Sequence, residues 1–573
     1  MRILRGVAAS PGIAVGSAFL YRPLEPYFER HKIETVEREI ARFTEAVESS
    51  KKQLTKIHAQ TQKEAGSELA EIFEAHILFL EDPALLDGVE ERIRGEKTNA
   101  EAALVDVIDG YAATLAALEN EYLRQRAVDV RDVGQRVLHN LLGVSAQPLS
   151  TLTSPVVVVA HDLTPSDTAQ MNKEMVLGFC TAMGSVTSHT AILARMLGTP
   201  AVVGLGESAL SIKDGEMIIV DGAEGVVTLH PDEETIQSYK RQQTRFEKGR
   251  KEAMTGAELP AQTQDGHRVA VVANIGDVQS ARVALEYGAE GVGLLRTEFL
   301  FFDRQSMPTE GEQYSAYRAV AEVMGQRPLI IRTLDIGGDK QLPYLEIGEE
   351  LNPSLGWRAI RLCLDLVDLF KTQLRAILRA AQGHNVKVMF PMIATLEELE
   401  RAKEILHEAQ GELLQEGLPL AQDIEVGIMV ETPSAALAID ILAPQADFLS
   451  VGTNDLIQYT MACDRTNERV SFLYDPLHPA ILRLIKHAID AAHQAGIWVG
   501  MCGEMAGDLE AIPILLGLSL DEFSMNAPAI PRAKAMIRSL SMDEAHDIAV
   551  QALSMTRAKD VRNHIRKYVK GRR

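Results

Sequence analysis

After residue 260 the sequence repeats one pattern eight times: a short β-rich apolar run is followed by a stretch with apolar residues at helical spacing. The runs are RVAVVANI (268–275), EGVGLLR (290–296), PLIIRTL (328–334), VKVMFPM (386–392), EVGIMVE (425–431), DFLSVG (447–452), IWVGMCG (497–503) and DEFSMN (521–526). Strands that alternate with helices build a parallel sheet, and eight such units close into a barrel. We therefore predict a (β/α)8 barrel over residues 261–573.

The N-terminal part predicts a second α/β domain that a helical segment interrupts. Strand-like runs occupy 7–19, 154–161, 175–180 and 201–204, and a hairpin with a glycine-containing turn spans 215–230. From residue 28 to residue 143, apolar residues follow helical spacing and proline occurs once, at Pro83. We expect one α/β domain made of 1–22 and 145–230, a helical subdomain at 23–144, and a linker helix at 231–260, where charges of both signs alternate.

Charge and cysteine content narrow the classes of function. The net charge of −22 argues against a binder of nucleic acids or anionic membranes, because either needs a basic face. Cys180, Cys363, Cys463 and Cys502 are widely spaced and form no CxxC pair, which suits a reducing cytoplasm. The first 21 residues lack a continuous apolar stretch, so we expect a strand and turn there rather than a signal peptide, and no membrane span.

Charged and polar residues follow several of the eight runs. In a (β/α)8 barrel the active site lies at the C-terminal ends of the strands. One arginine or acid after a strand is usually a surface residue or a helix cap, but recurrence at successive strand ends favours a site. The residues at these positions are Arg296, Arg332, Glu431, Asn454, Asp455 and Cys502.

The types of these residues indicate the chemistry. Glu431 and Asp455 are oxygen ligands suited to Mg²⁺, which takes further contacts from water and substrate oxygens. Four arginines, with Lys340 as a point charge, can bind carboxylate and phosphate groups: Arg296, Arg332, Arg358 and Arg465. The substrate is therefore expected to be small, anionic and phosphorylated. Cys502 is either a buried small apolar residue or, among cations, a proton donor or acceptor.

The stretch GSVTSHTAILARMLGTPAVVG (184–204) places His189 at the start of an expected helix. Thr187 or Ser188 serves as its N-cap in the simplest interpretation, with His189 a half-exposed residue of the first turn. Alternatively, the free N–H groups of the helix N-terminus and the nearby hydroxyls hold a phosphoryl group that the imidazole carries. The second interpretation requires a phosphoryl donor site elsewhere in the chain.

Together the motifs resemble the Enzyme I family, the phosphoenolpyruvate-protein phosphotransferases of the bacterial sugar phosphotransferase system. The resemblance runs nearly end to end, through TSHTAILAR, GVGLLRTEFLF, IRTLDIGGDK, NPSLGWRAIR, VGIMVETPSAA, FLSVGTNDLIQYTMACDR and GMCGEMAGD. It implies a phosphoenolpyruvate-binding barrel that uses Mg²⁺, a swivelling phosphohistidine domain, and a helical subdomain that docks the carrier protein HPr. It also implies a homodimer through the barrel.

The resemblance assigns a role to each matching position. It gives phosphoryl acceptance to His189, histidine orientation to Thr168, and protonation of the pyruvate enolate to Cys502. Glu431 and Asp455 hold the metal, and substrate contacts fall to Arg296, Arg332, Asn454 and Arg465, with Asp455, Arg358 and Lys340 beside them. Ser185 departs from the family, which has glycine or alanine there, and narrows the backbone freedom of the loop.

An acidic segment at 64–91 contains nine Asp or Glu and no Lys or Arg. A face of one sign steers a partner of the opposite sign, and the resemblance places the HPr dock here. The docking residues so implied are Glu68, Glu71, His76, Leu85, Leu115, Tyr122 and Arg126. The alternative is that Ile72, Phe73, Leu80 and Leu85 face a bundle core while the acids form its solvated side.

Two other functions are compatible with parts of the sequence. Pyruvate phosphate dikinase and phosphoenolpyruvate synthase resemble the barrel and the phosphohistidine domain, but add a large nucleotide-binding module. The helical segment is too short for such a module, and it lacks a glycine-rich phosphate loop. A regulatory protein that docks carriers without turnover predicts a degraded barrel site, whereas every expected side chain is present.

Overall fold

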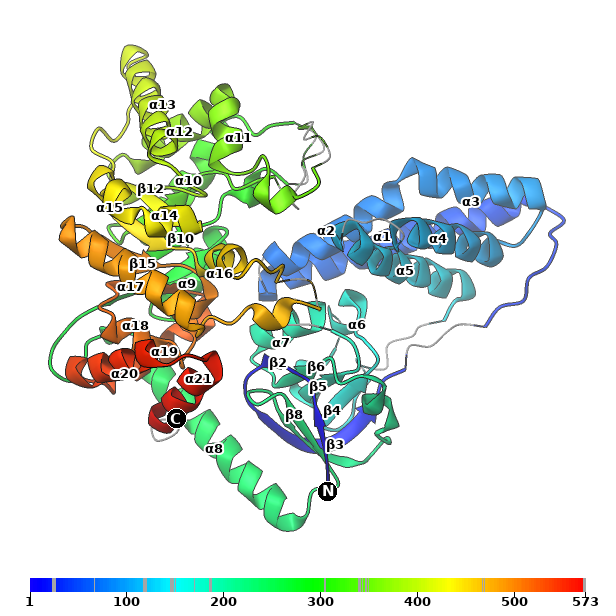
Figure 1. Ribbon diagram of the computed structural model, residues 1–573. Helices are drawn as coiled ribbons and strands as arrows, with labels where there is room; N and C mark the ends of the chain where they lie inside the picture. The colour runs from blue at the N-terminus through cyan, green and yellow to red at the C-terminus, as the bar shows by residue number, and fades with distance from the viewer. Residues whose placement is uncertain are drawn as a thin grey trace. The chain divides into compact units, whose positions relative to one another are not determined.

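A computed structural model describes the chain except residues 23–26, 66, 117–120, 145–148, 150, 170, 185–187, 303, 305, 338–341, 343, 346–347, 349, 466, 468 and 570–573. The structure divides into two compact units, Met1–Glu247 and Lys248–Arg573. Figure 1 shows the first unit in blue to green and the second in green to red. Within the described residues, no helix is both long enough and apolar enough to cross a bilayer.

The first unit contains an eight-stranded mixed sheet in the order β1-β8-β7-β3-β4-β5-β6-β2. Its strands are β1 (Arg2–Arg5), β2 (Val7–Ser10), β3 (Ile13–Leu20), β4 (Val156–Ala160), β5 (Val176–Thr181), β6 (Ala201–Val203), β7 (Met217–Asp221) and β8 (Val226–Leu229). Strands β3 to β6 pair in parallel, and β7 and β8 form the expected antiparallel hairpin.

Both faces of this sheet are covered, which explains its continuous apolar runs. Along β4, Val156, Val158 and Ala160 pack into one core cluster. Val157 and Val159 point to the other face and pack into a second cluster with Cys180. Short helices complete the unit: α6 (Pro165–Ala169) and α7 (His189–Leu197), with 3₁₀ turns at Lys173–Met175 and Glu207–Ser211.

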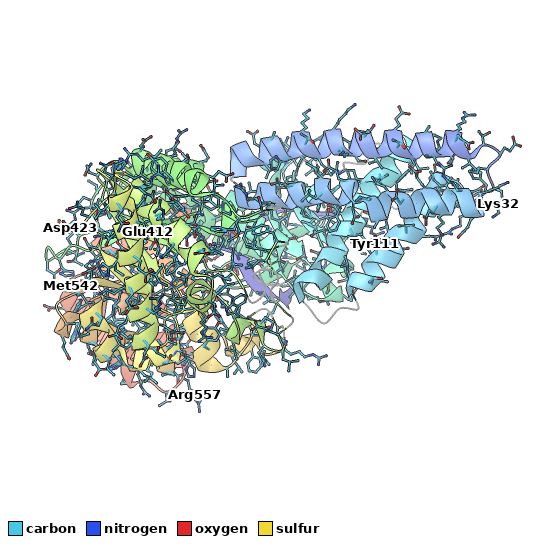
Figure 2. All side chains as sticks on the ribbon, turned by 90° about the horizontal axis from the view of Figure 1, so that it is seen from above. Lys32, Tyr111, Glu412, Asp423, Met542 and Arg557 are labelled. Carbon is cyan, nitrogen blue, oxygen red and sulfur yellow. The ribbon has the colours of Figure 1, made fainter. Side chains whose placement is uncertain are left out.

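Five helices are inserted between β3 and β4. They are α1 (Val36–Ala65), α2 (Ser67–Glu81), α3 (Pro83–Glu96), α4 (Ala100–Ala116) and α5 (Glu121–Leu142). Figure 2 shows the long helices lying beside one another, with Lys32 near one end. Helix α1 packs against α2, and α4 packs against α5. Their apolar faces enclose a separate core that includes Phe43, Phe73 and Leu80. Helix α8 (Glu233–Thr255) occupies the expected linker and crosses the boundary between the units.

The second unit is a closed barrel of eight parallel strands, which confirms the predicted fold. Each strand falls inside one of the eight predicted runs: β9 (Ala270–Ile275), β10 (Val292–Leu295), β11 (Leu329–Arg332), β12 (Val386–Phe390), β13 (Val426–Val430), β14 (Phe448–Val451), β15 (Trp498–Met501) and β16 (Glu522–Met525). The pairing of β16 with β9 closes the ring. Polar residues that follow these strands therefore converge on one end of the barrel.

Helices surround the barrel strands (Figure 1). They are α9 (Val278–Glu286), α10 (Glu310–Met324), α11 (Ile360–Asp365), α12 (Val367–Ala381), α13 (Leu396–Gln415), α14 (Pro433–Leu437), α15 (Ile439–Leu442), α16 (Thr453–Met461), α17 (Pro479–Gln494), α18 (Ile512–Gly517), α19 (Ile530–Arg538), α20 (Met542–Ser554) and α21 (Ala558–Val569). Reciprocal capping boxes start α10, where Thr309 pairs with Glu312, and α13, where Thr395 pairs with Glu398. Each box satisfies backbone donors that the first turn leaves free.

Candidate active site

The barrel brings most of the predicted site residues to the C-terminal ends of its strands. Arg332 is the last residue of β11, while Glu431 and Cys502 directly follow β13 and β15. Asn454 and Asp455 lie in the first turn of α16, after β14. These positions derive from separate strands that the closed ring makes neighbours.

Arg332 is a buried cation held by two buried carboxylates. Its Nη2 donates to Glu298 Oε1 at 2.8 Å, and its Nη1 lies 3.1 Å from Asp335 Oδ2. Glu298 Oε1 also accepts the backbone N–H of Asp335 at 3.2 Å, which ties the two acids together. The nearby carboxylates more than offset burial, so the pKa of Arg332 is raised and the group stays charged. Among the described residues, nothing accepts a hydrogen bond from its buried Nε.

Arg358 extends this charge chain toward the predicted metal ligands. Its Nη2 donates to both oxygens of Asp335, at 2.9 and 3.1 Å, and lies 3.5 Å from Asp455 Oδ2. Its Nη1 donates to the Tyr459 hydroxyl at 3.0 Å, and that hydroxyl donates to the Ser354 carbonyl at 2.6 Å. The side chain is thus fixed from two directions.

Glu431 is almost completely buried, with 1% of its surface exposed. One carboxylate oxygen accepts the backbone N–H of Met392 at 2.6 Å. Met392 has a φ of 58°, a left-handed conformation that a non-glycine residue adopts only under constraint and that is common at functional sites. Burial, and next the charge of Asp455, raise the pKa of Glu431 to about 8.

Glu431 and Asp455 fit the oxygen-ligand set of a divalent cation. The charge of Asp455 raises the pKa of Glu431, and a bound cation would offset this unfavourable interaction. In the part of the chain that the structure describes, no three His, Cys, Asp or Glu side chains form a metal-binding group. The chain therefore offers two carboxylates and leaves other coordination positions to water and substrate oxygens, as Mg²⁺ accepts.

Cys502 lies over the apolar interior of the barrel. Its neighbours there are Leu294, Ile330, Met389, Met429 and Phe448. Burial raises the pKa of the Cys502 thiol to about 11, although a hydrogen bond with Ser450 and the charges of Arg332 and Arg296 act in the opposite direction. The thiol therefore carries its proton at neutral pH and is suited to donate it.

The remaining predicted substrate residues differ in their surroundings. Arg296 directly follows β10 and is exposed, so its guanidinium is accessible to a ligand. Asn454 accepts the backbone N–H of Glu504 through its Oδ1 at 3.1 Å. Arg465 is half-buried after α16, where its backbone N–H donates to Gln458 Oε1 at 3.2 Å. Lys340 lies outside the described residues.

Three residues that organise this site were not predicted from the sequence: Glu298, Asp335 and Tyr459. Glu298 stands two residues after Arg296, and Asp335 three after Arg332. An acid two or three residues after an arginine at a strand end is the sequence signal that could have identified Glu298 and Asp335. No spacing rule links Tyr459 to Arg358, because they are 101 residues apart and meet only through the barrel.

His189 is the first residue of α7, as predicted. The Ser188 N-cap is extended, with φ −65° and ψ 154°, so the N-terminus of a nine-residue helix begins at the histidine. Gly184 precedes this turn with a φ of 114°, and a Cβ there would lie 3.0 Å from Ser188 Oγ. The His189 side chain and residues 185–187, including Ser185, lie outside the description.

Thr168, the expected orienting residue, is buried in α6, and α6 contacts α7. Its hydroxyl donates to the Pro165 carbonyl at 3.0 Å, with the Thr164 carbonyl 3.2 Å away. The oxygen of a hydroxyl that already donates can still accept. Thr168 is therefore suited to accept an imidazole N–H.

Two expected carrier-docking residues are core residues of the helical insert and need correction. His76 is 0% exposed and Leu85 5%, so neither side chain reaches a surface where a partner docks. Leu85 packs in the insert core with Phe73 and Leu80, which confirms the core interpretation for these three. The His76 side chain extends from α2 toward α5. Its Nε2 lies 3.5 Å from Asp129 Oδ1 and its Nδ1 3.8 Å from Asp132 Oδ2.

Leu115 is half-buried against the same core. The side chains of Glu68, Glu71, Ile72, Tyr122 and Arg126 lie outside the described part of the chain. Two acids of α2 have described surroundings: Glu74 is half-exposed, and Glu81 is exposed with its Oε1 3.0 Å from Lys51 Nζ. The acidic dock therefore stays a prediction.

Family models match three successive segments of the chain. They are described as the N-terminal, mobile and PEP-binding domains of PEP-utilising enzymes, and match residues 5–126, 152–225 and 250–542. The chain is also similar over its length to phosphoenolpyruvate-protein phosphotransferases. Identity is 47% over 567 residues with that of Staphylococcus carnosus (strain TM300), covering 99% of both chains.

Two further relatives carry the same name. Identity is 49% over 566 residues with the protein of Bacillus sp. (strain S), covering 99% of this chain and 98% of the relative. It is 49% over 561 residues with that of Bacillus subtilis (strain 168), covering 98% of each. The similarity thus includes both units and the helical insert.

Proposed function

Because the chain belongs to the phosphoenolpyruvate-protein phosphotransferase family of PEP-utilising enzymes, we propose that it transfers the phosphoryl group of phosphoenolpyruvate to its own His189. The phosphorylated histidine then passes the group to a histidine-containing carrier protein of the HPr type. Pyruvate is the other product. This is the first step of sugar uptake by a phosphotransferase system.

The observation that carries the proposal is the charged site at the C-terminal end of the barrel. Arg332 is buried and positively charged, and its Nε has no acceptor among the described residues. A small anion with carboxylate and phosphate oxygens supplies the missing acceptor. Arg296 is exposed beside it and can contact the same anion.

Transfer to the histidine follows from these charges. The imidazole nitrogen of His189 forms a bond to phosphorus as the bond from phosphorus to the enol oxygen breaks, and the electron pair stays on that oxygen. Arg332 and Arg296 stabilise the charge that develops on the phosphoryl and enolate oxygens. Their orientation is set before substrate binds, because Glu298 and Asp335 already hold Arg332.

Glu431 and Asp455 are the residues that would hold Mg²⁺, which when bound supplies positive charge to the phosphoryl and enolate oxygens. Arg358 keeps Asp455 in place from the other side, at 3.5 Å. The Met392 amide fixes the orientation of the Glu431 carboxylate.

Cys502 completes the reaction by protonating the enolate. The thiol proton moves to C3 of the enolate, the carbonyl of pyruvate forms, and the resulting thiolate recovers a proton from water. Burial keeps the thiol protonated until this step. All four cysteines are free, which suits the reducing cytoplasm as the place of the reaction.

The helical insert is the part we assign to carrier docking, with the acidic residues of 64–91 facing a basic partner. The second unit is the part through which the resemblance implies a homodimer. Helix α8 joins the unit with the histidine to the unit with the substrate site. Phosphoryl transfer requires the two units to approach and separate.

Incubation with ³²P-phosphoenolpyruvate and Mg²⁺, with and without ATP, tests this function. We expect one label per chain that acid removes and base preserves, as for a phosphohistidine, and no effect of ATP. Added HPr should remove the label. Labelling that depends on ATP would instead indicate dikinase chemistry, and label that HPr cannot remove would contradict the carrier step.

A further inference from the structure

The short segment that carries Cys502 is fastened to the barrel on both sides of the thiol. The Cys502 backbone N–H donates to the Val451 carbonyl of β14 at 3.1 Å. Its carbonyl accepts a hydrogen bond from Asn274 Nδ2 at 2.9 Å. Two residues later, the Glu504 backbone N–H donates to Asn454 Oδ1. One of these three contacts comes from the side chain of Asn274, in β9, which is not adjacent to β15 in the ring.

Asn274 is itself oriented by a second side chain. Its Oδ1 accepts a hydrogen bond from Ser524 Oγ at 2.6 Å, which fixes which end of the amide faces Cys502. Ser524 is in β16, the strand next to β9, and it is 1% exposed. Gly293 of β10 leaves room for this hydroxyl, because a Cβ there would lie 2.5 Å from Ser524 Oγ.

These contacts are not part of the barrel ladder. The strand order places β16 between β15 and β9, so Asn274 reaches past one strand to the loop that follows β15. The hydrogen bonds between β16 and β9 form without it, through the backbone. The Asn274 side chain thus links Ser524 of β16 to the loop that carries the thiol, in addition to the backbone pairing that closes the barrel.

We propose that Asn274, oriented by Ser524, is a positioning residue that sets the direction of the Cys502 thiol toward the enolate carbon. The inference rests on the proposed role of Cys502 as proton donor. Proton transfer to carbon needs the donor within contact distance of one face of the enolate, and a misplacement of about 1 Å can lower a rate about 100-fold. Phosphoryl transfer uses other groups and does not share this requirement.

Exchange of the methyl protons of pyruvate with D₂O, followed by proton NMR on the full chain with Mg²⁺, isolates this step. We expect Asn274→Ala to slow enzyme-catalysed exchange at least tenfold and Ser524→Ala to slow it several-fold. The affinity for phosphoenolpyruvate and the single-turnover labelling of the protein should change less than twofold. A purely structural role would weaken binding, labelling and exchange together.

Two further variants separate the possible failures. Cys502→Ala should abolish exchange, and if it does not, the proposed role of Cys502 fails. If Cys502→Ala abolishes exchange but Asn274→Ala leaves it normal, the positioning role of Asn274 is wrong.

Asp447→Ala is the matched control, because Asp447 Oδ2 accepts the Val426 backbone N–H at 2.7 Å at the opposite end of the barrel. Equal loss of exchange in this control, or parallel loss of substrate affinity in Asn274→Ala, would overturn the inference.

Discussion

At the scale of single residues, the buried arginines of the candidate active site are held in place by buried acids. Arg332 has Glu298 and Asp335, and Arg358 has Asp335 and Asp455. A buried charge that loses its partner is strongly unfavourable, because water cannot replace that partner. Each acid thus both stabilises the fold and fixes the direction of an arginine.

Glu298→Ala should remove one of the two carboxylates that pair with the buried guanidinium of Arg332. We expect the free energy of unfolding of the second unit to fall by about 3 kcal/mol, and kcat/KM for phosphoenolpyruvate to fall at least tenfold. Thermal unfolding and self-phosphorylation measure these effects. Arg401→Ala is the control, since its pairs with Glu404 and Glu408 are exposed and such pairs contribute about 0.5 kcal/mol each. Similar effects of both variants would contradict the account.

Glu431 and Asp455 should behave as one metal site. Ala at either position should raise the Mg²⁺ concentration needed for self-phosphorylation. The double variant should lose little more activity than the less active of the two single variants, because the shared ion is already lost. Mn²⁺ should substitute for Mg²⁺, since it accepts the same oxygen ligands. Titration of activity with either metal checks this, and additive losses would indicate separate roles.

Glu522 predicts a pH dependence of stability. Burial, partly opposed by Lys387, raises its pKa from 4.5 to about 7 in the folded chain. The folded state therefore holds this proton more tightly, and the stabilisation present below pH 4.5 is lost as pH rises through 7. At pH 8 the difference amounts to at most about 3 kcal/mol.

Replacement of Glu522 by Gln should remove that loss. The Tm of Glu522→Gln relative to the parent protein should increase between pH 5 and pH 8, as measured by calorimetry of the full chain. A difference in Tm that stays constant across this range would show that Glu522 does not titrate there.

Residue types after the strands were sufficient to predict the charged site. They predicted Arg332, Glu431, Asp455 and Cys502 because position and chemistry coincide there. They could not predict Tyr459, whose contact with Arg358 depends on how helix α16 lies against the segment that precedes α11. His76 was expected at the docking surface because of the family resemblance, whereas the bundle buries its side chain beside two aspartates.

At the scale of elements, strands were predictable because both of their faces are buried. A run such as VGIMV in β13 has no polar position, so it is apolar throughout and is easily recognised. Helix starts were also readable where capping boxes occur, as at Thr395. The surfaces of the insert helices were not predictable, because one apolar residue can face either the bundle core or a partner.

Helix α2 carries the prediction that concerns the carrier. Reversal of Glu68, Glu71 and Glu74 to Lys should slow transfer to HPr, mainly through the association rate, and reduce its salt dependence. Self-phosphorylation should remain normal, because the barrel site is unchanged. Stopped-flow transfer at several ionic strengths measures this.

The matched control reverses Glu286, Glu400 and Glu404, which are exposed acids of the second unit. This control produces the same change in net charge away from the insert. Equal slowing by both triple variants would show that overall charge, and not the face of α2, governs association.

At the scale of the whole molecule, the proposed acceptor histidine and the proposed substrate site belong to different compact units. His189 starts a helix of the first unit, and the charged site is in the second. In the proposed function, this separation would let His189 react in turn with phosphoenolpyruvate in the barrel and with the carrier protein outside it. The central claim is that His189 carries the phosphoryl group between them.

The most direct test is the labelling of His189→Ala by ³²P-phosphoenolpyruvate in the presence of Mg²⁺. The account predicts that the variant acquires no acid-labile label, while it still folds and still exchanges the methyl protons of pyruvate with D₂O. The parent protein, assayed in parallel, should acquire one label per chain. Full labelling of His189→Ala would show that another residue accepts the phosphoryl group and would contradict the account.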